Sequence, residues 1–258
     1  MKFFFYLWFL SSSALSFKSS IDTILVAGAR GKTGREVVYQ ALKKGVNVVA
    51  LTRGNGDLFV PPGSGQMDGI STKTLMSDLP FEGNLSIVVG DATDPDHVAK
   101  CFYEKPIGGV VMALGGNTED VGKRMNSLST TNILVQMSHH ATRRIAAVTS
   151  VGTGDSYEQA PLFFKGLMAT IYKDMFEDKN IQEDMISQTD TEWCIVRPGG
   201  LTNGRPLGNV APVVAGTIGN IARADVANFC LDAVLNSTFQ YRREKVSISN
   251  VKNRYSTR

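Results

Sequence analysis

Cysteine and histidine are scarce in this sequence, and their scarcity argues against two common kinds of stabilised domain. The 258 residues include three cysteines and three histidines. An odd number of cysteines, each in an apolar stretch, does not predict a disulfide framework and favours a reducing compartment. The histidines do not combine with cysteines at zinc-ligand spacings, so no metal site is predicted. The residues concerned are Cys101, Cys194 and Cys230, and His97, His139 and His140.

The sequence also has little excess of charge of one sign. The net charge is only +3, and no long charge run or internal repeat is present. A nucleic-acid surface requires clustered lysine and arginine, so no nucleic-acid partner is predicted. A small molecule is the expected partner. The length and the apolar fraction of 43% suit one sizeable core, and hence one domain.

No apolar run is long enough to cross a membrane. The longest amino-terminal run, Phe3–Leu10, follows Lys2 and precedes small residues, and a span needs about 20 residues. Residues 1–16 are therefore predicted to be a signal peptide, with no permanent membrane anchor. An uncleaved apolar tail is the alternative.

Residues 17–20, Phe-Lys-Ser-Ser, resemble the start of the transit segment in bipartite presequences of algae with complex plastids. This resemblance implies a plastid location and agrees with free thiols. A secreted or lumenal protein remains the alternative, in which Asn84 and Asn236 would be glycosylation acceptors.

From Ile21 to Arg258, short β-rich runs alternate with helical patterns. Near-continuous apolar strands separated by helices predict an α/β domain with a parallel sheet covered on both faces. Residues 54–80 are rich in glycine and proline, and we expect them to form a mobile insertion. The strand candidates are "TILVAG", "VNVVALTR", "SIVVGD", "GGVVMALGG", "RIAAVTS" and "EWCIVRPGG".

A glycine-rich loop follows the first of these strands, in "ILVAGARGKTGREVV". A mononucleotide P-loop would need a glycine five positions before Gly31, where Val26 stands. The spacing of Gly28, Gly31 and Gly34 instead matches a variant of the dinucleotide fingerprint, between a strand and a helix. The pyrophosphate would lie over the helix N-terminus, at Gly31, Lys32 and Thr33.

The charge near the ribose separates NAD from NADP. An acidic residue about 20 positions after the loop accepts the ribose hydroxyl of NAD, whereas arginine receives the 2′-phosphate of NADP. The second strand ends in Arg53, and Arg30 lies in the loop itself, so NADP is predicted. The ends of the third and fourth strands would line the same cleft. Asp91 would accept the adenine amino group or cap the next helix. The other residues at these strand ends are Ala92, Ala113, Leu114 and Gly115.

The motifs "VAGARGKTG", "VVALTR", "VVGDATD", "RIAAVTSVG", "WCIVRPGGLTNG" and "IARADVANFCLDAV" occur in the order seen in atypical short-chain dehydrogenase/reductases. The chain resembles in particular their NAD(P)H-binding, NmrA-like group, which includes flavin reductase and biliverdin-IX-beta reductase. The resemblance implies a Rossmann-type doubly wound parallel sheet in a single domain with a small C-terminal substrate lobe. It also implies that residues 197–200, which include Pro198, Gly199 and Gly200, border the nicotinamide, and that Asp225 starts a helix closing the sheet.

The wider superfamily uses a Tyr-x-x-x-Lys pair after the serine of its fifth strand. Ser150 matches that serine, but Tyr157 is followed four residues later by Pro161 and Tyr172 by Phe176. Two copies of the pattern lie elsewhere and are expected on the surface. They run from Tyr39 to Lys43 and from Tyr241 to Lys245.

Without that pair, oxidation of an alcohol lacks its general base. Hydride transfer to an electron-poor acceptor needs mainly positioning and can take its proton from water. The sequence thus predicts an NADPH-dependent reductase of a conjugated or carbonyl acceptor of the flavin, quinone or bilin type. The alternative is a non-catalytic NADP(H)-binding redox sensor or an assembly or regulatory scaffold. Candidate catalytic residues are Ser150, Tyr157, Tyr172 and Lys179.

Five acidic residues near Lys179 are expected to form a solvated helix face rather than a metal site. These are Asp174, Glu177, Asp178, Glu183 and Asp184.

Overall fold

The computed structural model describes residues 21–54, 56–115 and 124–250. Within them, eight strands form one sheet in the order β3-β2-β1-β4-β5-β6-β10-β8. Seven of these strands run parallel, and β8 pairs antiparallel with β10 at the edge. The strands are β1 (Thr23–Ala27), β2 (Asn47–Thr52), β3 (Leu85–Val89), β4 (Gly109–Met112), β5 (Arg144–Val148), β6 (Glu192–Pro198), β7 (Gly200–Thr202), β8 (Val210–Pro212), β9 (Asn220–Ala222) and β10 (Glu244–Asn250).

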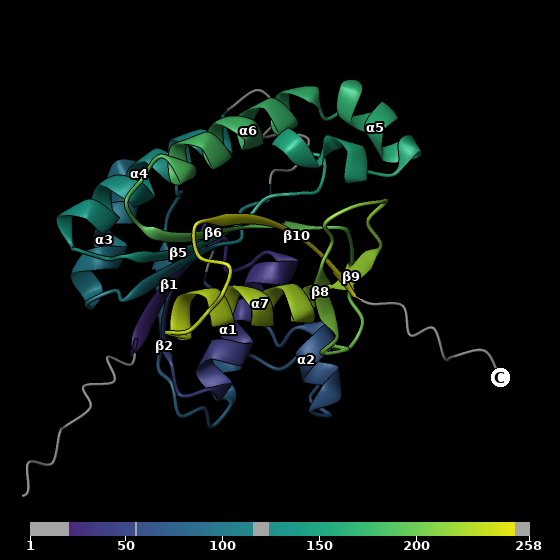
Figure 1. Cartoon of the computed structure of the whole chain (residues 1–258). Helices are drawn as coiled ribbons and strands as arrows, with labels where there is room; N and C mark the ends of the chain where they lie inside the picture. The colour runs from purple at the N-terminus through teal and green to yellow at the C-terminus, as the bar shows by residue number, and fades with distance from the viewer. Residues whose placement is uncertain (1–20, 55, 116–123, 251–258) are drawn as a thin grey trace, which may run out of the picture.

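Helices cover both faces of this sheet, as Figure 1 shows. One layer holds α1, α2 and α7, and the other holds α3, α4, α5 and α6. The Rossmann-type doubly wound fold predicted from the sequence is therefore confirmed, as are its six strand candidates. The helices are α1 (Lys32–Lys43), α2 (Pro62–Met67), α3 (Pro95–Glu104), α4 (Met125–His139), α5 (Leu162–Ala169), α6 (Lys173–Ser187) and α7 (Arg223–Leu235).

Strand β1 illustrates how the sequence builds these layers. All five of its residues are buried, and successive side chains of a strand point to opposite faces. Ile24 and Val26 join the apolar cluster beneath α1 and α7. Leu25 and Ala27 join the cluster beneath α3, α4 and α6. A strand buried on both sides must be apolar throughout, which is why these runs do not alternate with polar residues.

The segment 54–80 differs from our expectation of a mobile insertion. Its residues Leu58, Val60 and Met76 are buried, and Pro62 opens α2 at a helix position that suits proline. The backbone N–H groups at the start of α2 donate to the buried carboxylate of Glu36 on α1. The apolar residues among the glycines and prolines therefore pack this segment against α1.

Strand β10 was missed in the sequence. It lies between β6 and β8 in the sheet. Its serines, Ser247 and Ser249, are buried, and serine gives no strand signal. The lobe after β6 is small, since β7 and β9 pair as a separate ribbon.

Candidate functional site

A cleft of about 420 Å3 opens at the carboxyl ends of β1, β2, β3 and β4. The chain reverses its direction of winding between β1 and β4, and open α/β sheets bind ligands at such a switch point. Nine of the predicted cofactor residues line this cleft. They are Gly28, Arg30, Gly31, Arg53, Asp91, Ala92, Ala113, Leu114 and Gly115.

The glycines of the loop are required by close backbone approach. Gly28 has φ +83°, and a β-carbon there would lie 2.6 Å from the carbonyl oxygen of Ala113. A β-carbon on Gly34 would overlap the carbonyl oxygen of Gly28. These two positions hold the loop against β4 and allow α1 to start close behind it.

The N-terminus of α1 has no side-chain cap and no acidic residue in its first turn. By contrast, Asp94 caps α3, and Asp178 accepts from the backbone N–H groups of Asn126 and Ser127 at the start of α4. An uncapped N-terminus at the cleft presents unpaired N–H groups and a positive dipole end to an anion. Lys32 and Thr33 form the first turn of this helix.

Arg30 and Arg53 are exposed where β2 meets the cleft. Asp91 lies at the end of β3, where its Oδ1 accepts from the backbone N–H and the hydroxyl of Thr93. The interpretation of Asp91 as a helix cap is wrong, because Asp94 is the residue that caps α3. Among the described lining residues, the two cations are Arg30 and Arg53, and both lie near the end of β2.

Helix α4 also contributes to the cleft, which no pattern in the sequence indicated. Met125 and Ser129 of this helix line the cleft. Ser129 is fully buried, and its Oγ has no hydrogen-bond partner among the described residues. A buried hydroxyl without a partner is unfavourable, so this atom suits a polar ligand in the cleft.

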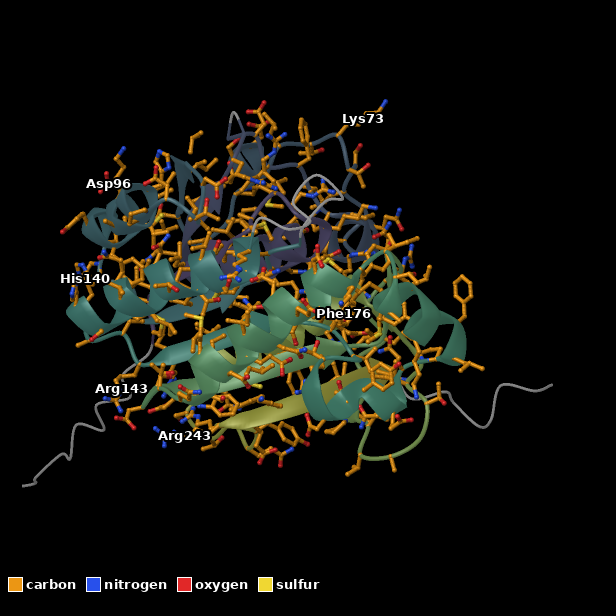
Figure 2. The ribbon with its side chains drawn as sticks, turned by 90° about the horizontal axis from the view of Figure 1, so that it is seen from above. Lys73, Asp96, His140, Arg143, Phe176 and Arg243 are labelled. Carbon is orange, nitrogen blue, oxygen red and sulfur yellow. The ribbon has the colours of Figure 1, made fainter. Side chains whose placement is uncertain are left out.

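The candidate catalytic residues are not among the residues that line this cleft. Ser150 is half-buried and its Oγ donates to the carbonyl of Val151. Tyr157 is exposed, with the Lys165 ammonium 4.9 Å from its ring centroid. Tyr172 packs with Phe176, which Figure 2 labels on α6 where α5 lies against it. Contacts with these neighbours explain the positions of Tyr157 and Tyr172 without a catalytic role.

Lys179 is buried on α6. Burial lowers its pKa to about 8, against the opposing effect of the charges of Glu183 and Asp178. Met175 stands four residues before it. Lys179 therefore has no tyrosine at the spacing that the wider superfamily uses.

The acidic residues of α6 divide into two sets, which corrects the prediction of a solvated face. Asp174, Glu177 and Asp184 are exposed, whereas Asp178 and Glu183 are buried. Asp178 is buried because it caps α4, and Glu183 is buried because it binds a cation of the next strand.

That cation is Arg197, which the resemblance placed beside the nicotinamide. Its Nη2 lies 2.5 Å from Glu183 Oε2, its Nη1 lies 2.6 Å from Asp155 Oδ1, and only 2% of its side chain is exposed. Glu183 Oε1 also accepts from Thr149 Oγ1 at 2.7 Å. Arg197 therefore joins β6 to α6 and to the loop after β5.

The turn after Arg197 is shaped by packing. A β-carbon on Gly199 would overlap the backbone oxygen of Gly219, and one on Gly200 would overlap the side chain of Asn220. Among the described residues, Pro198, Gly199 and Gly200 are not part of the cleft lining. Close contact between β7 and β9 accounts for both glycines.

The prediction that both displaced copies of the Tyr-Lys pattern lie on the surface is wrong for Tyr39. Its ring is buried beneath α2, and its hydroxyl donates to Asp68 at 2.7 Å. Burial, followed by that hydrogen bond, raises its pKa. Tyr241 stacks on Phe229 at the other end of the chain.

In the described ranges, no group of three or more potential ligands could hold a metal ion. No described helix is long and apolar enough to cross a membrane. The predicted signal and transit residues, 1–20, lie outside the described residues. The three cysteines are free and buried, and burial raises the pKa of the Cys194 thiol to about 12.

The residues present fit a dinucleotide. A β-carbon at Gly28 would have no room beside β4. The N-terminus of α1 has no side-chain cap, and the buried hydroxyl of Ser129 at the cleft has no hydrogen-bond partner among the described residues. Together these features offer the space and the donors that a pyrophosphate and its riboses require.

Comparison with known proteins agrees with this fit. A family model described as NAD(P)H-binding matches residues 70–237. The uncharacterized chloroplastic protein At2g34460 of Arabidopsis thaliana is 28% identical over 230 residues, which are 85% of this chain and 74% of that protein.

Solved structures share the fold. ChuY, an anaerobillin reductase from Escherichia coli O157:H7, has a TM-score of 0.66 and 21% identity, over 89% of this chain and 98% of that chain. A short-chain dehydrogenase/reductase from Veillonella parvula in complex with NADP has a TM-score of 0.64 and 14% identity, over 91% of this chain and 97% of that chain. The family match covers well over half of the sequence, and the chain therefore belongs to the NAD(P)H-binding family.

Proposed function

We propose that this protein is an NADPH-dependent reductase that transfers hydride to a conjugated or carbonyl acceptor of the flavin, quinone or bilin type. The observation that carries the cofactor preference is the pair of arginines, Arg30 and Arg53, at the β2 end of the cleft. Guanidinium groups bind phosphate in a bidentate fork, which a ribose hydroxyl cannot match.

The α6 side of the protein supports the choice of acceptor. Lys179 is a buried lysine on α6, and Met175, not a tyrosine, stands four residues before it. A methionine cannot act as the acid or base that alcohol chemistry requires. NADPH, when bound, supplies the hydride, and a flat electron-poor acceptor takes up its proton from water. The fold shared with ChuY, an anaerobillin reductase, is consistent with a bilin-like acceptor.

Ser150 and Lys179 are the two chain groups that we place nearest the acceptor. Lys179 lies one helical turn before Glu183, so the two share a helix face. Glu183 binds Thr149, the residue before Ser150. Because Glu183 contacts the residue after β5, we place Lys179 near that strand end as well, where Ser150 can orient a carbonyl by a hydrogen bond.

The test is consumption of NADPH by the full chain with FMN, riboflavin, biliverdin and quinones. Turnover with any of them supports the reductase and names its acceptor class. Tight binding of NADPH without turnover across the panel favours the NADP(H) sensor or scaffold, and failure to bind either nucleotide contradicts both.

We further propose that residues 21–258 form the catalytic domain, that residues 1–16 are removed as a signal peptide, and that the mature protein enters a plastid. The chloroplastic Arabidopsis relative supports this location. Mass spectrometry of the mature N-terminus checks it: a start at Phe17 or later is expected, and an intact N-terminus or glycans on Asn84 or Asn236 would contradict it.

A further inference from the structure

The distal half of Arg30 lies across the backbone of Gly54, just beyond the end of β2. A β-carbon built on Gly54 would overlap Arg30 Nη1, and it would lie 2.8 Å from Cζ and 3.4 Å from Cδ. Both residues line the cleft. The guanidinium therefore occupies the space that any side chain at position 54 would need.

The surrounding backbone leaves little other room for adjustment. Ala29 N donates to the carbonyl of Leu51, which ties the glycine loop to β2. Gly90 N donates to the carbonyl of Thr52, and Thr52 Oγ1 donates to that of Gly54. A new side chain at position 54 would thus be relieved mainly by rotation of Arg30.

Glycine at position 54 is not required by its own conformation. Its φ lies outside the left-handed region that favours glycine, so alanine could adopt the same backbone. The absence of a side chain at position 54 instead leaves space for the Arg30 guanidinium.

We propose that Gly54 is a determinant of cofactor specificity. By lacking a side chain, it lets Arg30 lie at the end of β2 and bind the 2′-phosphate of NADPH there. This inference rests on the proposed NADPH preference and adds a residue that acts only through the position of Arg30.

The test is a double-mutant cycle on the full chain, with dissociation constants for NADPH and NADH as the readout. Gly54→Ala is expected to weaken NADPH binding about tenfold, which is typical for loss of a charge-assisted hydrogen bond, and to change NADH binding less than about twofold. In the Arg30→Ala background, the same substitution should have no further effect.

Gly166→Ala is the matched control, since a β-carbon there meets open space on α5. It should leave both dissociation constants unchanged. The melting temperature of Gly54→Ala should stay close to that of the wild type, because the end of a flexible side chain can move at small cost.

Equal weakening of NADH and NADPH by Gly54→Ala, or a full effect in the Arg30→Ala background, would overturn the inference. Equal binding of NADPH and NADH by the wild type would overturn the inference as well. Reductase activity of the protein could still be observed in that case, with either nucleotide as the hydride donor. If the cycle behaves as expected but no acceptor is reduced, the specificity role stands and the reductase proposal fails.

Discussion

The two sides of the molecule that flank the proposed reaction are built by different means. The cofactor side is shaped by backbone, since Gly31 and Gly34 lie close to the carbonyl of Gly28, and Gly28 lies close to that of Ala113 after β4. The α6 side is shaped by buried charge, since Asp178, Glu183 and Arg197 join elements far apart in the chain. The first depends on close backbone contacts and the second on contacts between buried side chains.

The largest effect is expected where the buried charges meet. Glu183→Ala would leave Arg197 buried without its main partner, and loss of one member of a buried pair costs about 3–5 kcal/mol. Urea unfolding should show this loss. Asp155→Ala is the control, because Asp155 is 82% exposed although it binds the same arginine, and it should cost less than about 1 kcal/mol. Equal losses would refute the special role of burial.

On the cofactor side, Gly34→Ala would force a β-carbon against the carbonyl of Gly28. Overpacking of this kind costs about 1–3 kcal/mol, and displacement of the loop should also abolish tight nucleotide binding. Thermal unfolding and NADPH titration check both effects. Gly166→Ala, on open α5, should have neither, and a Gly34→Ala variant that binds normally would show that the loop tolerates a side chain.

Lys179 should make the free energy of unfolding depend on pH. Its pKa in the folded chain is about 8, below the ordinary 10.5, so the unfolded chain binds a proton that the folded chain releases between these values. Stability from this group therefore rises with pH across that window. Lys179→Met should remove the slope and raise the free energy of unfolding at pH 7 by about 3 kcal/mol.

The control for that slope is Lys173→Met, a change at a lysine whose side chain is 65% exposed on the same helix. It should leave the pH dependence of unfolding as in the wild type. If both variants keep the slope between pH 8 and 10.5, burial of Lys179 is not its source.

A smaller effect is expected at the cap of α4. Asp178→Ala removes the acceptor for two backbone N–H groups, and loss of a helix cap costs about 1–2 kcal/mol. Asp184→Ala, an exposed position on α6, should stay within about 0.5 kcal/mol of the wild type. Comparing the free energies of unfolding of the two variants by chemical denaturation distinguishes loss of the helix cap from a general loss of acidic charge.

The same contrast explains what could be predicted from the sequence. The glycine spacing, the arginine after β2 and the apolar strand runs each lie within a short stretch of sequence, so spacing and residue type identify them. The burial of Asp178 and Glu183 depends on partners at positions 126, 127 and 197, which no local pattern reveals. Ser129 was missed for the same reason, since a helical serine carries no signal that it faces a cleft.

In the proposed complex, the cleft at the ends of β1 to β4 binds NADPH through Arg30 and Arg53. Calorimetric titration of the full chain with NADPH and NADH, on the wild type and on Arg53→Ala, measures this selectivity. We predict that the wild type binds NADPH at least about tenfold more tightly than NADH and that Arg53→Ala removes most of this difference. Equal affinities in the wild type, or a preference that survives the substitution, would contradict it.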